Sequence, residues 1–438
     1  MERYKEYKDS GVQWLGEIPS HWGIEPFGRH FTYGKGLPIT KADLQPKGIP
    51  VVSYGQVHSK QNTGVSITDS LIRFVSPSYL NTNPQALLEK GDFAFADTSE
   101  DIEGSGNCCF NDYPDKIFAG YHIVVARPVD LSYPKYYAYL FQSKKWKNQV
   151  QSLVNGVKVF SINKRILKKS FILIPTLEEQ EQIVSYLDAK TSKIDGYIAE
   201  KEKEVQLLEE LKQTEIANVV TKGLNPNAKM KDTNSLISSL CPAHWIIVRN
   251  KTILSPTGVK VGNRASEYVL LSLTTKGIIV RDIDSGKGKF PKDFDTYQFV
   301  HKDELVFCLF DIDETPRTVG LVKTEGMLTG AYTALKVNKQ LALPEYIYNY
   351  YLCVDNIKAL KPYYSGLRKT VRADKFLQIY IPIPPIDEQR EIVSYIESKI
   401  QKIDTLISEL NAEIEYMKEY KQRLIADAVT GHINVQNL

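Results

Sequence analysis

The stretch IPTLEEQEQIVSYLDAKTSKID at residues 174–195 returns as IPIPPIDEQREIVSYIESKIQKID at residues 381–404. With Ile174 placed on Ile383, the two copies align without a gap as far as Asn225. At this offset of 209, 23 of 52 positions are identical. A match of this quality indicates one structural unit that is used twice. We therefore expect a pseudo-two-fold molecule that takes a two-part ligand.

The repeat extends, more weakly, into the chain that precedes each copy. KDSGVQWLGEIPSHW (8–22) aligns with KDTNSLISSLCPAHW (231–245), and YPKYYAYL (133–140) aligns with LPEYIYNY (343–350). The order is thus lobe, acidic segment, lobe, acidic segment. The expected boundaries are residues 1–175 for the first lobe, 176–222 for the first long helix, 223–384 for the second lobe, and 385–438 for the second long helix with its tail.

The acidic segments carry apolar residues at alternating spacings of three and four, which is typical of a heptad seam. Each segment follows a proline and has acidic residues in its first turn, which suits the positive end of a helix. We predict two helices of about 42 residues, packed antiparallel as an intramolecular coiled coil, with the lobes at opposite ends. Lysines at the equivalent positions 212 and 421 either set the register or only extend toward solvent. The predicted seam consists of Val184, Leu187, Ile194, Ile198, Val205, Leu208, Val393, Ile396, Ile400, Ile403, Ile407, Leu410, Ile414 and Met417.

The net charge of +3 conceals an alternation along the 438 residues. Residues 1–175 carry a net +5, residues 176–222 a net −5, residues 223–384 a net +7, and residues 385–431 a net −4. Basic lobes suit a polyanion such as DNA, although chance scatter over solvated surfaces is the alternative. The acidic helices either dock a partner protein or are merely solvated.

The composition, 42% hydrophobic and 24% charged, is typical of a globular protein and excludes collagen-like, mucin-like and wholly disordered chains. We find no apolar run of about 18 residues and therefore predict no membrane-spanning helix. The beginning, MERYKEYKDSG, lacks the apolar core of a secretory signal, so we expect a cytosolic protein. The five cysteines form no CxxC motif, and we interpret them as reduced structural thiols.

The lobes, at residues 24–172 and 247–381, read as mixed α/β and rich in strands, so the fold class is α+β. Helices are expected at 134–152 and 344–360. The strands expected from β-branched and aromatic runs are residues 51–57, 92–96, 121–128, 268–273, 277–280, 304–310 and 332–337.

Basic residues gather near the end of each lobe, after a glycine and before a long helix. Because the two clusters recur at matching places, phosphate binding is favoured over a solvated surface. Loops of the second lobe add further candidates for reading base edges. The candidate DNA-binding residues are Lys144, Lys145, Lys147, Lys158, Lys164, Arg165, Lys168, Lys169, Arg264, Lys276, Arg281, Arg317, Lys361, Tyr363, Tyr364, Arg368, Lys369 and Arg372.

No constellation for catalysis or metal binding stands out. The chain has no GxxxxGK[ST], no GxGxxG, no HExxH and no [ND]PP[YF] tetrapeptide. The repeated His–Trp pairs, at residues 21–22 and 244–245, are interpreted as a buried tryptophan with a capping histidine. We therefore predict that the chain has no catalytic residue and no metal or cofactor site of its own.

The order lobe, PxxxEQ-helix, lobe, PxxxEQ-helix resembles the specificity (S) subunit of type I restriction–modification systems. YKDSGVQWLGEIPSHW near the start and IADAVTGHIN near the end add to the resemblance, which covers essentially the whole chain. The start of the second lobe, NSLISSLCPAHW, departs from the GVxWLGxIPxHW pattern of such subunits.

This resemblance implies that each lobe reads one half of a bipartite DNA site and that the helix pair sets the gap. It also implies partners: two methyltransferase (M) subunits use S-adenosylmethionine, and two restriction (R) subunits, which use ATP and Mg²⁺, can join the complex. Two other classes stay open at this point, namely a scaffold that binds only proteins and a self-contained DNA enzyme. Loss of DNA affinity with salt distinguishes the scaffold, and activity of the chain alone distinguishes the enzyme.

Overall fold

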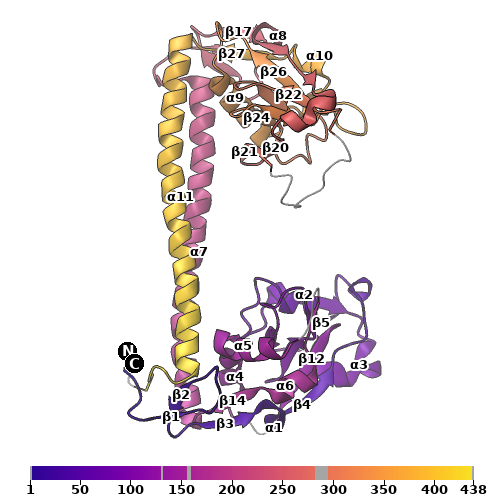
Figure 1. Cartoon of the computed structure of the whole chain (residues 1–438), viewed down its shortest axis with the longest axis vertical. Helices are drawn as coiled ribbons and strands as arrows, with labels where there is room; N and C mark the ends of the chain where they lie inside the picture. Colours follow the sequence, from indigo (N-terminus) through magenta and orange to yellow (C-terminus); the bar gives the residue numbers. More distant parts are fainter. Residues whose placement is uncertain (1, 130–131, 155–158, 282–293, 437–438) are drawn as a thin grey trace. The chain divides into compact units, whose positions relative to one another are not determined.

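The computed structural model of the chain describes residues 2–129, 132–154, 159–281 and 294–436. The chain divides into two compact units. The first contains Met1–Glu202 with Ala412–Leu438, and the second contains Lys203–Asn411. Each unit contains one lobe and one part of each of two long helices (Figure 1).

The two long helices are α7 (Leu177–Lys222) and α11 (Ile386–Val429), with 46 and 44 residues. At 1.5 Å per residue these are about 69 and 66 Å long. The first turn of each contains two acidic side chains, which the helix dipole favours. The prediction of two long helices is confirmed.

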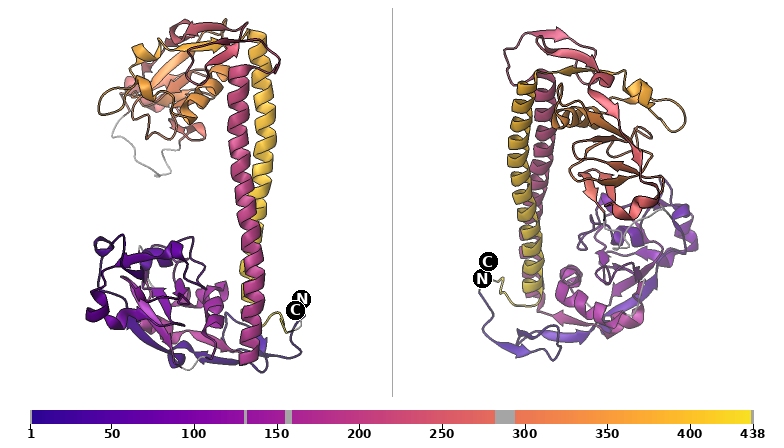
Figure 2. Two further views of the ribbon diagram at one scale, coloured as in Figure 1. Left: turned by 180° about the vertical axis from the view of Figure 1, so that it is seen from behind. Right: turned by 45° about the horizontal axis from the view of Figure 1, so that its top comes forward.

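Within each unit the two long helices lie side by side and run antiparallel (Figures 1 and 2). In the first unit, Lys421 Nζ donates to the Asp195 carboxylate at 2.7 Å. In the second unit, Lys212 Nζ donates to Asp404 Oδ1 at 2.6 Å. The two ion pairs are equivalent by the offset of 209. Both seam lysines therefore end on a carboxylate of the other helix, and this pairing favours one register.

The apolar seam lies where the helices meet. Its buried residues are Val184, Leu187, Ile194, Ile198, Ile396, Ile403 and Ile414. Its half-buried residues are Val205, Leu208, Val393, Ile400, Ile407, Leu410 and Met417. None of these side chains is exposed, as the heptad spacing requires.

The first lobe is built on two four-stranded sheets. One has the order β10-β8-β12-β4 and is antiparallel, and the other has the order β6-β5-β11-β7 and includes one parallel pair, β5 with β11. The strands are β4 (Phe31–Lys35), β5 (Ile49–Val52), β6 (Arg73–Val75), β7 (Leu87–Leu88), β8 (Phe93–Ala96), β10 (Cys108–Phe110), β11 (Ile117–Ala119) and β12 (Ile123–Pro128).

Short pairs of strands and small helices complete the first lobe. The strands are β1 (Tyr7–Asp9) with β2 (Glu17–Pro19), β3 (Gly23–Pro26) with β14 (Phe171–Ile174), and β9 (Thr98–Ser99) with β13 (Phe160–Ser161). The helices are α1 (Phe27–His30), α2 (Tyr54–Val57), α3 (Tyr79–Thr82), α4 (Pro134–Gln142), α5 (Lys144–Leu153) and α6 (Lys164–Lys169).

The second lobe repeats the antiparallel sheet of the first in the order β18-β26-β23-β24, which corresponds to β4-β12-β8-β10. The repeat in sequence is thus a repeat of topology. Its strands are β15 (Met230–Asp232), β16 (Leu240–Pro242), β17 (Ile246–Arg249), β18 (Leu254–Pro256), β19 (Val259–Lys260), β20 (Leu271–Thr274), β21 (Gly277–Val280), β22 (Gln298–Val300), β23 (Leu305–Phe307), β24 (Val319–Leu321), β25 (Gly326–Leu328), β26 (Thr333–Val337) and β27 (Tyr380–Ile383). Its helices are α8 (Asn250–Ile253), α9 (Pro344–Asn356) and α10 (Ala373–Phe376).

The strand expected at 268–273 begins only at Leu271, and the strand expected at 304–310 is shorter, from Leu305 to Phe307. Two further predicted elements are interrupted in the structure. The strand expected at 51–57 ends at Val52, because Ser53 and Gln56 form a capping box that starts the helical turn α2. The helix expected at 134–152 is divided into α4 and α5 at Ser143, whose side chain accepts a hydrogen bond from the Trp146 amide. Local capping side chains interrupt both patterns.

Each lobe is bonded to the first turn of the long helix that follows it. Trp22 Nε1 donates to Glu179 Oε1 at 3.1 Å, and His21 Nε2 lies 2.9 Å from the same oxygen. In the second copy, Trp245 Nε1 donates to Glu388 Oε1 at 3.1 Å, and His244 Nε2 lies 2.7 Å from Glu388 Oε2. Both tryptophans are buried, as the sequence predicts, and each histidine and tryptophan contacts a helix carboxylate.

Each lobe also contacts the last turn of the other long helix. The Tyr136 hydroxyl donates to the carbonyl of Val429 at 2.8 Å, and the Tyr346 hydroxyl donates to that of Val220 at 3.1 Å. Near the first of these contacts the chain ends meet, because the Asn434 amide donates to the Glu2 carbonyl at 2.9 Å. In each unit one lobe thus joins the start of one long helix to the end of the other.

All five cysteines are free and buried, as expected for structural thiols. Over the described part of the chain, no helix is both long enough and apolar enough to cross a membrane.

The Glu179 contact gives a pH prediction. Burial raises the pKa of Glu179, but hydrogen bonds from His21, Trp22 and Thr176 outweigh burial and hold that pKa below its usual 4.5. A pKa that is lowered on folding stabilises the protein above the unfolded value, and this stabilisation is lost as the pH falls through the lowered value. We expect Glu179→Gln to lower the free energy of unfolding at neutral pH by about 1–3 kcal/mol and to flatten its decline in acid.

Denaturant titrations of both proteins from neutral pH to about pH 3 measure this difference. Glu178→Gln is the matched control, because Glu178 lies in the same first turn and is exposed. Equal losses in the two variants would contradict a specific role for the Glu179 carboxylate.

Candidate nucleic-acid interface

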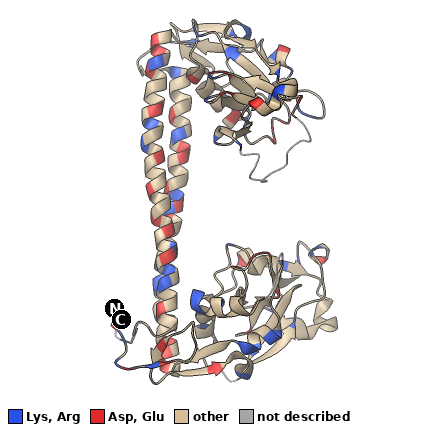
Figure 3. Cartoon of the chain, viewed as in Figure 1, with Lys and Arg blue, Asp and Glu red and all other residues tan. Residues whose placement is uncertain are grey.

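The short helix α6 of the first lobe is rich in basic residues, coloured blue in Figure 3. The Asn163 side chain accepts hydrogen bonds from the amides of Arg165 and Ile166 and so starts the helix. Leu167 is fully buried and fixes one side of the helix in the core. The four cationic side chains on the remaining surface are exposed, namely Lys164, Arg165, Lys168 and Lys169.

The three lysines around Trp146 differ in accessibility. Lys144 is exposed, but Lys147 Nζ donates to Asn107 Oδ1 at 2.8 Å and Lys145 Nζ lies 3.1 Å from His432 Nε2. Burial lowers the pKa of both Lys145 and Lys147. These two lysines are therefore engaged within the protein. Lys158, the remaining candidate of this lobe, lies outside the described residues.

The basic cluster of the second lobe is paired with carboxylates. Arg368 lies 3.7 Å from Asp311, and Lys369 lies 3.3 Å from Asp313 and 3.2 Å from Glu314. Lys361 also reaches Asp313, at 3.4 Å, and Arg372 reaches Asp374, at 3.2 Å. The interleaved Tyr363 is exposed and Tyr364 is half-buried. The charge that the sequence suggests is thus largely balanced within the lobe.

The other candidates of the second lobe are dispersed. Arg264 is exposed and bonded to Glu267 at 2.7 and 2.9 Å, and Lys276 is exposed in the turn between β20 and β21. Arg281 is half-buried after β21. Arg317 is 18% exposed and donates to Asp355 at 3.2 Å, which places it in a largely buried ion pair.

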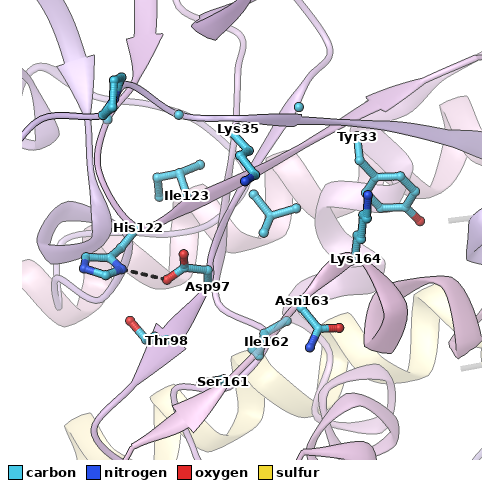
Figure 4. A pocket seen from close by; sticks show the side chains of 15 residues that line it. Tyr33, Lys35, Asp97, Thr98, His122, Ile123, Ser161, Ile162, Asn163 and Lys164 are labelled. Atoms are coloured by element: carbon cyan, nitrogen blue, oxygen red, sulfur yellow. Dashed lines mark hydrogen bonds and ion pairs between the residues drawn. The ribbon is translucent and has the colours of Figure 1, made fainter.

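A pocket of about 730 Å³ opens in the first lobe between β4, the start of β12, the β9–β13 pair and α6 (Figure 4). Sequence reasoning found Lys164 but missed the other polar residues of its lining, among them Lys35, Asp97 and His122. The side chains of Lys164 and Tyr33 lie on one side, the Asp97–His122 pair lies on the other, and Lys35 extends between them (Figure 4).

Asp97 and His122 are fixed by the backbone as well as by their side chains. His122 Nδ1 lies 3.0 Å from Asp97 Oδ1, and the Asp97 amide donates to the His122 carbonyl at 3.0 Å. His122 has a φ of 56°, which is uncommon for a residue other than glycine. One signal for the pair was available in the sequence. Asp97 follows the strand predicted at 92–96, and His122 is the second residue of the strand predicted at 121–128, and in an antiparallel pair one strand ends where its neighbour begins.

A family model described as type I restriction modification DNA specificity domain matches residues 31–207 and 312–416, which is well over half of the chain. The chain belongs to this family.

Relatives of similar length support the same family. The putative type I restriction enzyme MjaX specificity subunit of Methanocaldococcus jannaschii is 23% identical, over all of this chain and 99% of the relative. The type I restriction enzyme EcoKI specificity subunit of Escherichia coli K12 is 22% identical, over 96% of this chain and 91% of the relative.

A solved structure has the same fold. It is described as "Structural basis underlying complex assembly and conformational transition of the type I R-M system". The likeness has a TM-score of 0.67 at 16% identity and covers 95% of this chain and 99% of that one.

The specificity subunit supplies DNA sequence recognition to a type I restriction–modification complex and has no catalytic activity of its own. Its partners are therefore DNA and the other subunits of that complex. In this subunit the exposed cations of α6 are suited to phosphates, which position a protein on DNA without reading its sequence.

The difference in charge pairing between the lobes gives a prediction for DNA binding by the assembled complex. Alanine at Lys164, Arg165, Lys168 and Lys169 together should weaken binding to all duplexes alike. The slope of log K against log salt should become shallower by about 0.9 for each phosphate that the variant no longer neutralises. Alanine at Arg368, Lys369 and Arg372 should reduce DNA affinity and the salt-dependence slope by less per removed cation than the α6 variant does. The reason is that these cations are paired with carboxylates.

Salt titrations of binding, followed by fluorescence anisotropy, measure both slopes. Equal changes in slope per removed cation in the two lobes would contradict the inference that carboxylate pairing withholds charge from DNA.

Proposed function

We propose that each lobe of this specificity subunit reads one half of a bipartite DNA site and that the helix pair sets the gap between the halves. The repeated topology carries this proposal. The two lobes share a sheet order, a Trp–Glu bond to the following helix and a Tyr–carbonyl bond to the other helix. Equivalent frames that bear different surface residues are suited to two different half-sites.

The proposal includes two methyltransferase subunits, and repeat-equivalent apolar positions on the long helices support this number. Leu207 and Leu211 of α7 are 55% and 45% exposed, and Tyr416 and Tyr420 of α11 are 67% and 38% exposed. The offset of 209 relates Leu207 to Tyr416 and Leu211 to Tyr420. Members of each pair are four residues apart and so lie on one face of a helix. Exposed Leu and Tyr side chains are suited to burial against a partner.

Chemistry in this proposal belongs to the partners. The methyltransferase subunits bring S-adenosylmethionine, and two restriction subunits, which use ATP and Mg²⁺, complete the form that cleaves DNA. In the described part of the chain no three His, Cys, Asp or Glu side chains are grouped so as to hold a metal ion.

The experiment that tests the half-site proposal is an adenine-methylation map of a host genome. Two maps are compared, one from cells with the methyltransferase subunit and this chain and one from cells with the methyltransferase subunit alone. We expect a gapped two-part motif that depends on the chain. A continuous, ungapped motif, or the same motif without the chain, would overturn the proposal.

The apolar pairs predict the stoichiometry. Leu207→Asp with Leu211→Asp should weaken binding of one methyltransferase subunit by at least about 2 kcal/mol, since buried charges replace two apolar side chains. Tyr416→Asp with Tyr420→Asp should weaken binding of the other. Native mass spectrometry should then show one methyltransferase subunit in each variant in place of two. The matched control is Glu209→Gln, an exposed position between the leucines on another side of α7. Retention of two subunits in both variants would contradict these docking surfaces.

The helix pair predicts a change in the gap. The variant carries one extra heptad after Lys203 and one after the repeat-equivalent Ala412. Whole heptads keep the apolar seam in phase, and both insertions lie between the ion pairs Asp195–Lys421 and Lys212–Asp404. Seven residues add about 10.5 Å of helix, or about three base pairs at 3.4 Å. We expect a methylation map with a longer gap and unchanged half-sites. An altered half-site with the original gap would contradict the role of the helices as a spacer.

A further inference from the structure

We propose that the pocket of the first lobe is a DNA-contact site. In this site Lys35 and Lys164 hold phosphates, and His122, positioned by Asp97, reads the exocyclic amine of an adenine or cytosine. This inference rests on the proposed reading of one half-site by each lobe, and it goes further by naming the residues and the kind of base.

The two lysines supply charge that the protein does not neutralise. Lys35 ends strand β4 and Lys164 begins helix α6, so two separate elements fix their spacing. Both are exposed, and within the described residues neither lies within 4.0 Å of a carboxylate. The lysines and arginines at the end of the second lobe are, by contrast, paired with Asp311, Asp313 and Glu314. Pocket-lining amines with no carboxylate partner among the described residues are suited to the phosphates of a duplex.

The chemistry of the Asp97–His122 pair determines what the imidazole offers to DNA. An ionised carboxylate only accepts hydrogen bonds, so the hydrogen of the 3.0 Å contact lies on His122 Nδ1. In the neutral ring Nε2 is then an acceptor. The side chain of His122 is 58% exposed, and Nε2 has no hydrogen-bond partner among the described residues. In the major groove adenine N6 and cytosine N4 are the donors that such an acceptor selects.

The backbone around His122 holds this group in a fixed place. The carbonyl of Asp97 accepts from the Ile162 amide at 2.7 Å, and the carbonyl of His122 accepts from the Asp97 amide at 3.0 Å. The φ of 56° at His122 costs free energy that the surrounding contacts must offset, and such residues cluster at functional sites. His122 therefore projects from a defined turn at the edge of a sheet.

The second lobe keeps the scaffold and lacks the pair. The neighbours Ala94 and Val125 of the first lobe correspond in register to Val306 and Ala334 of the second. Both residues of the pair lie three positions beyond these neighbours, toward the pocket. At the same positions of the second lobe, Leu309 takes the place of Asp97 and Ala331 takes the place of His122. The two lobes thus differ in chemistry at this position, as two unlike half-sites require.

The test uses the assembled complex of the full chain with its methyltransferase subunits. Competition binding with duplexes that carry each base pair in turn at every position of both half-sites measures discrimination. We expect His122→Asn, which tolerates a positive φ, to reduce the preference for A or C at one position of one half-site by about threefold to tenfold. The other half-site serves as an internal control for folding and assembly.

Asp97 is tested as a positioning residue. The carboxamide of Asp97→Asn presents either a donor or an acceptor to Nδ1, so Nε2 loses its fixed role and the same position should lose discrimination. Asp97→Glu keeps an acceptor and should retain part of the preference. Affinity for the best site should change less than discrimination does, which a merely structural defect would not produce.

The lysines are tested by salt dependence. Lys35→Ala with Lys164→Ala should weaken binding to all sequences and make the log K against log salt slope shallower by about 1.8, at 0.9 for each phosphate contact. Lys116→Ala is the matched control, because Lys116 is exposed elsewhere on the first lobe. A slope that changes no more than in the control would overturn the phosphate contacts.

Failure of this inference is distinguishable from failure of the proposed function. A wild-type complex without a gapped motif would overturn the half-site proposal itself. A wild-type gapped motif together with unaltered discrimination at every position in His122→Asn would overturn the role of the pocket alone. A preference for G or T at the position read by His122 would also overturn it, because those bases present acceptors there.

Discussion

A carboxylate in the first turn of each long helix decides how a lobe joins that helix. Glu179 accepts hydrogen bonds from Trp22 and the backbone and side chain of Thr176, and Glu388 accepts one from Trp245. Burying a carboxylate is unfavourable unless donors surround it, so an indole N–H and the helix start must meet in one geometry. The tyrosine contacts to Val429 and Val220 then attach the same lobe to the end of the other helix. The antiparallel pair and the lobes are thereby one connected frame within each unit.

This frame is the same in both halves, whereas the surfaces that it carries are not. Among the described residues no carboxylate lies within 4.0 Å of the cations of α6, and the first lobe has a pocket with a histidine–carboxylate pair. In the second lobe the arginines and lysines near the end face Asp311, Asp313 and Glu314. The proposed reading of two unlike half-sites needs a common geometry with unlike contacts. The duplication followed by divergence that we observe has that form.

Counting basic residues overstates the charge available to DNA. Arg368 and Asp311 are 57 residues apart in the chain and only 3.7 Å apart in space, so no local window of sequence reveals their pairing. Lys147 is a similar case, since its amine is used by Asn107 and Gln142. Among the described residues, the cations of α6 have no carboxylate within 4.0 Å, whereas the basic cluster near the end of the second lobe is paired, so we expect these two clusters to contribute unequally to DNA binding.

The sequence by itself determined the duplication, the two long helices and the apolar seam between them, because repeats and heptads are local patterns with a fixed period. It also identified the basic residues that α6 carries, and it revealed the resemblance to specificity subunits. The division of the expected helix at Ser143 and the turn after Val52 come from capping contacts over only three residues, which hydrophobic periodicity does not detect. The 3.0 Å contact of Asp97 with His122 and the pairing of Arg368 with Asp311 were decided by tertiary structure. Both of these contacts depend on which side chains the fold brings together. Such contacts join residues far apart in the chain, and periodicity carries no information about them.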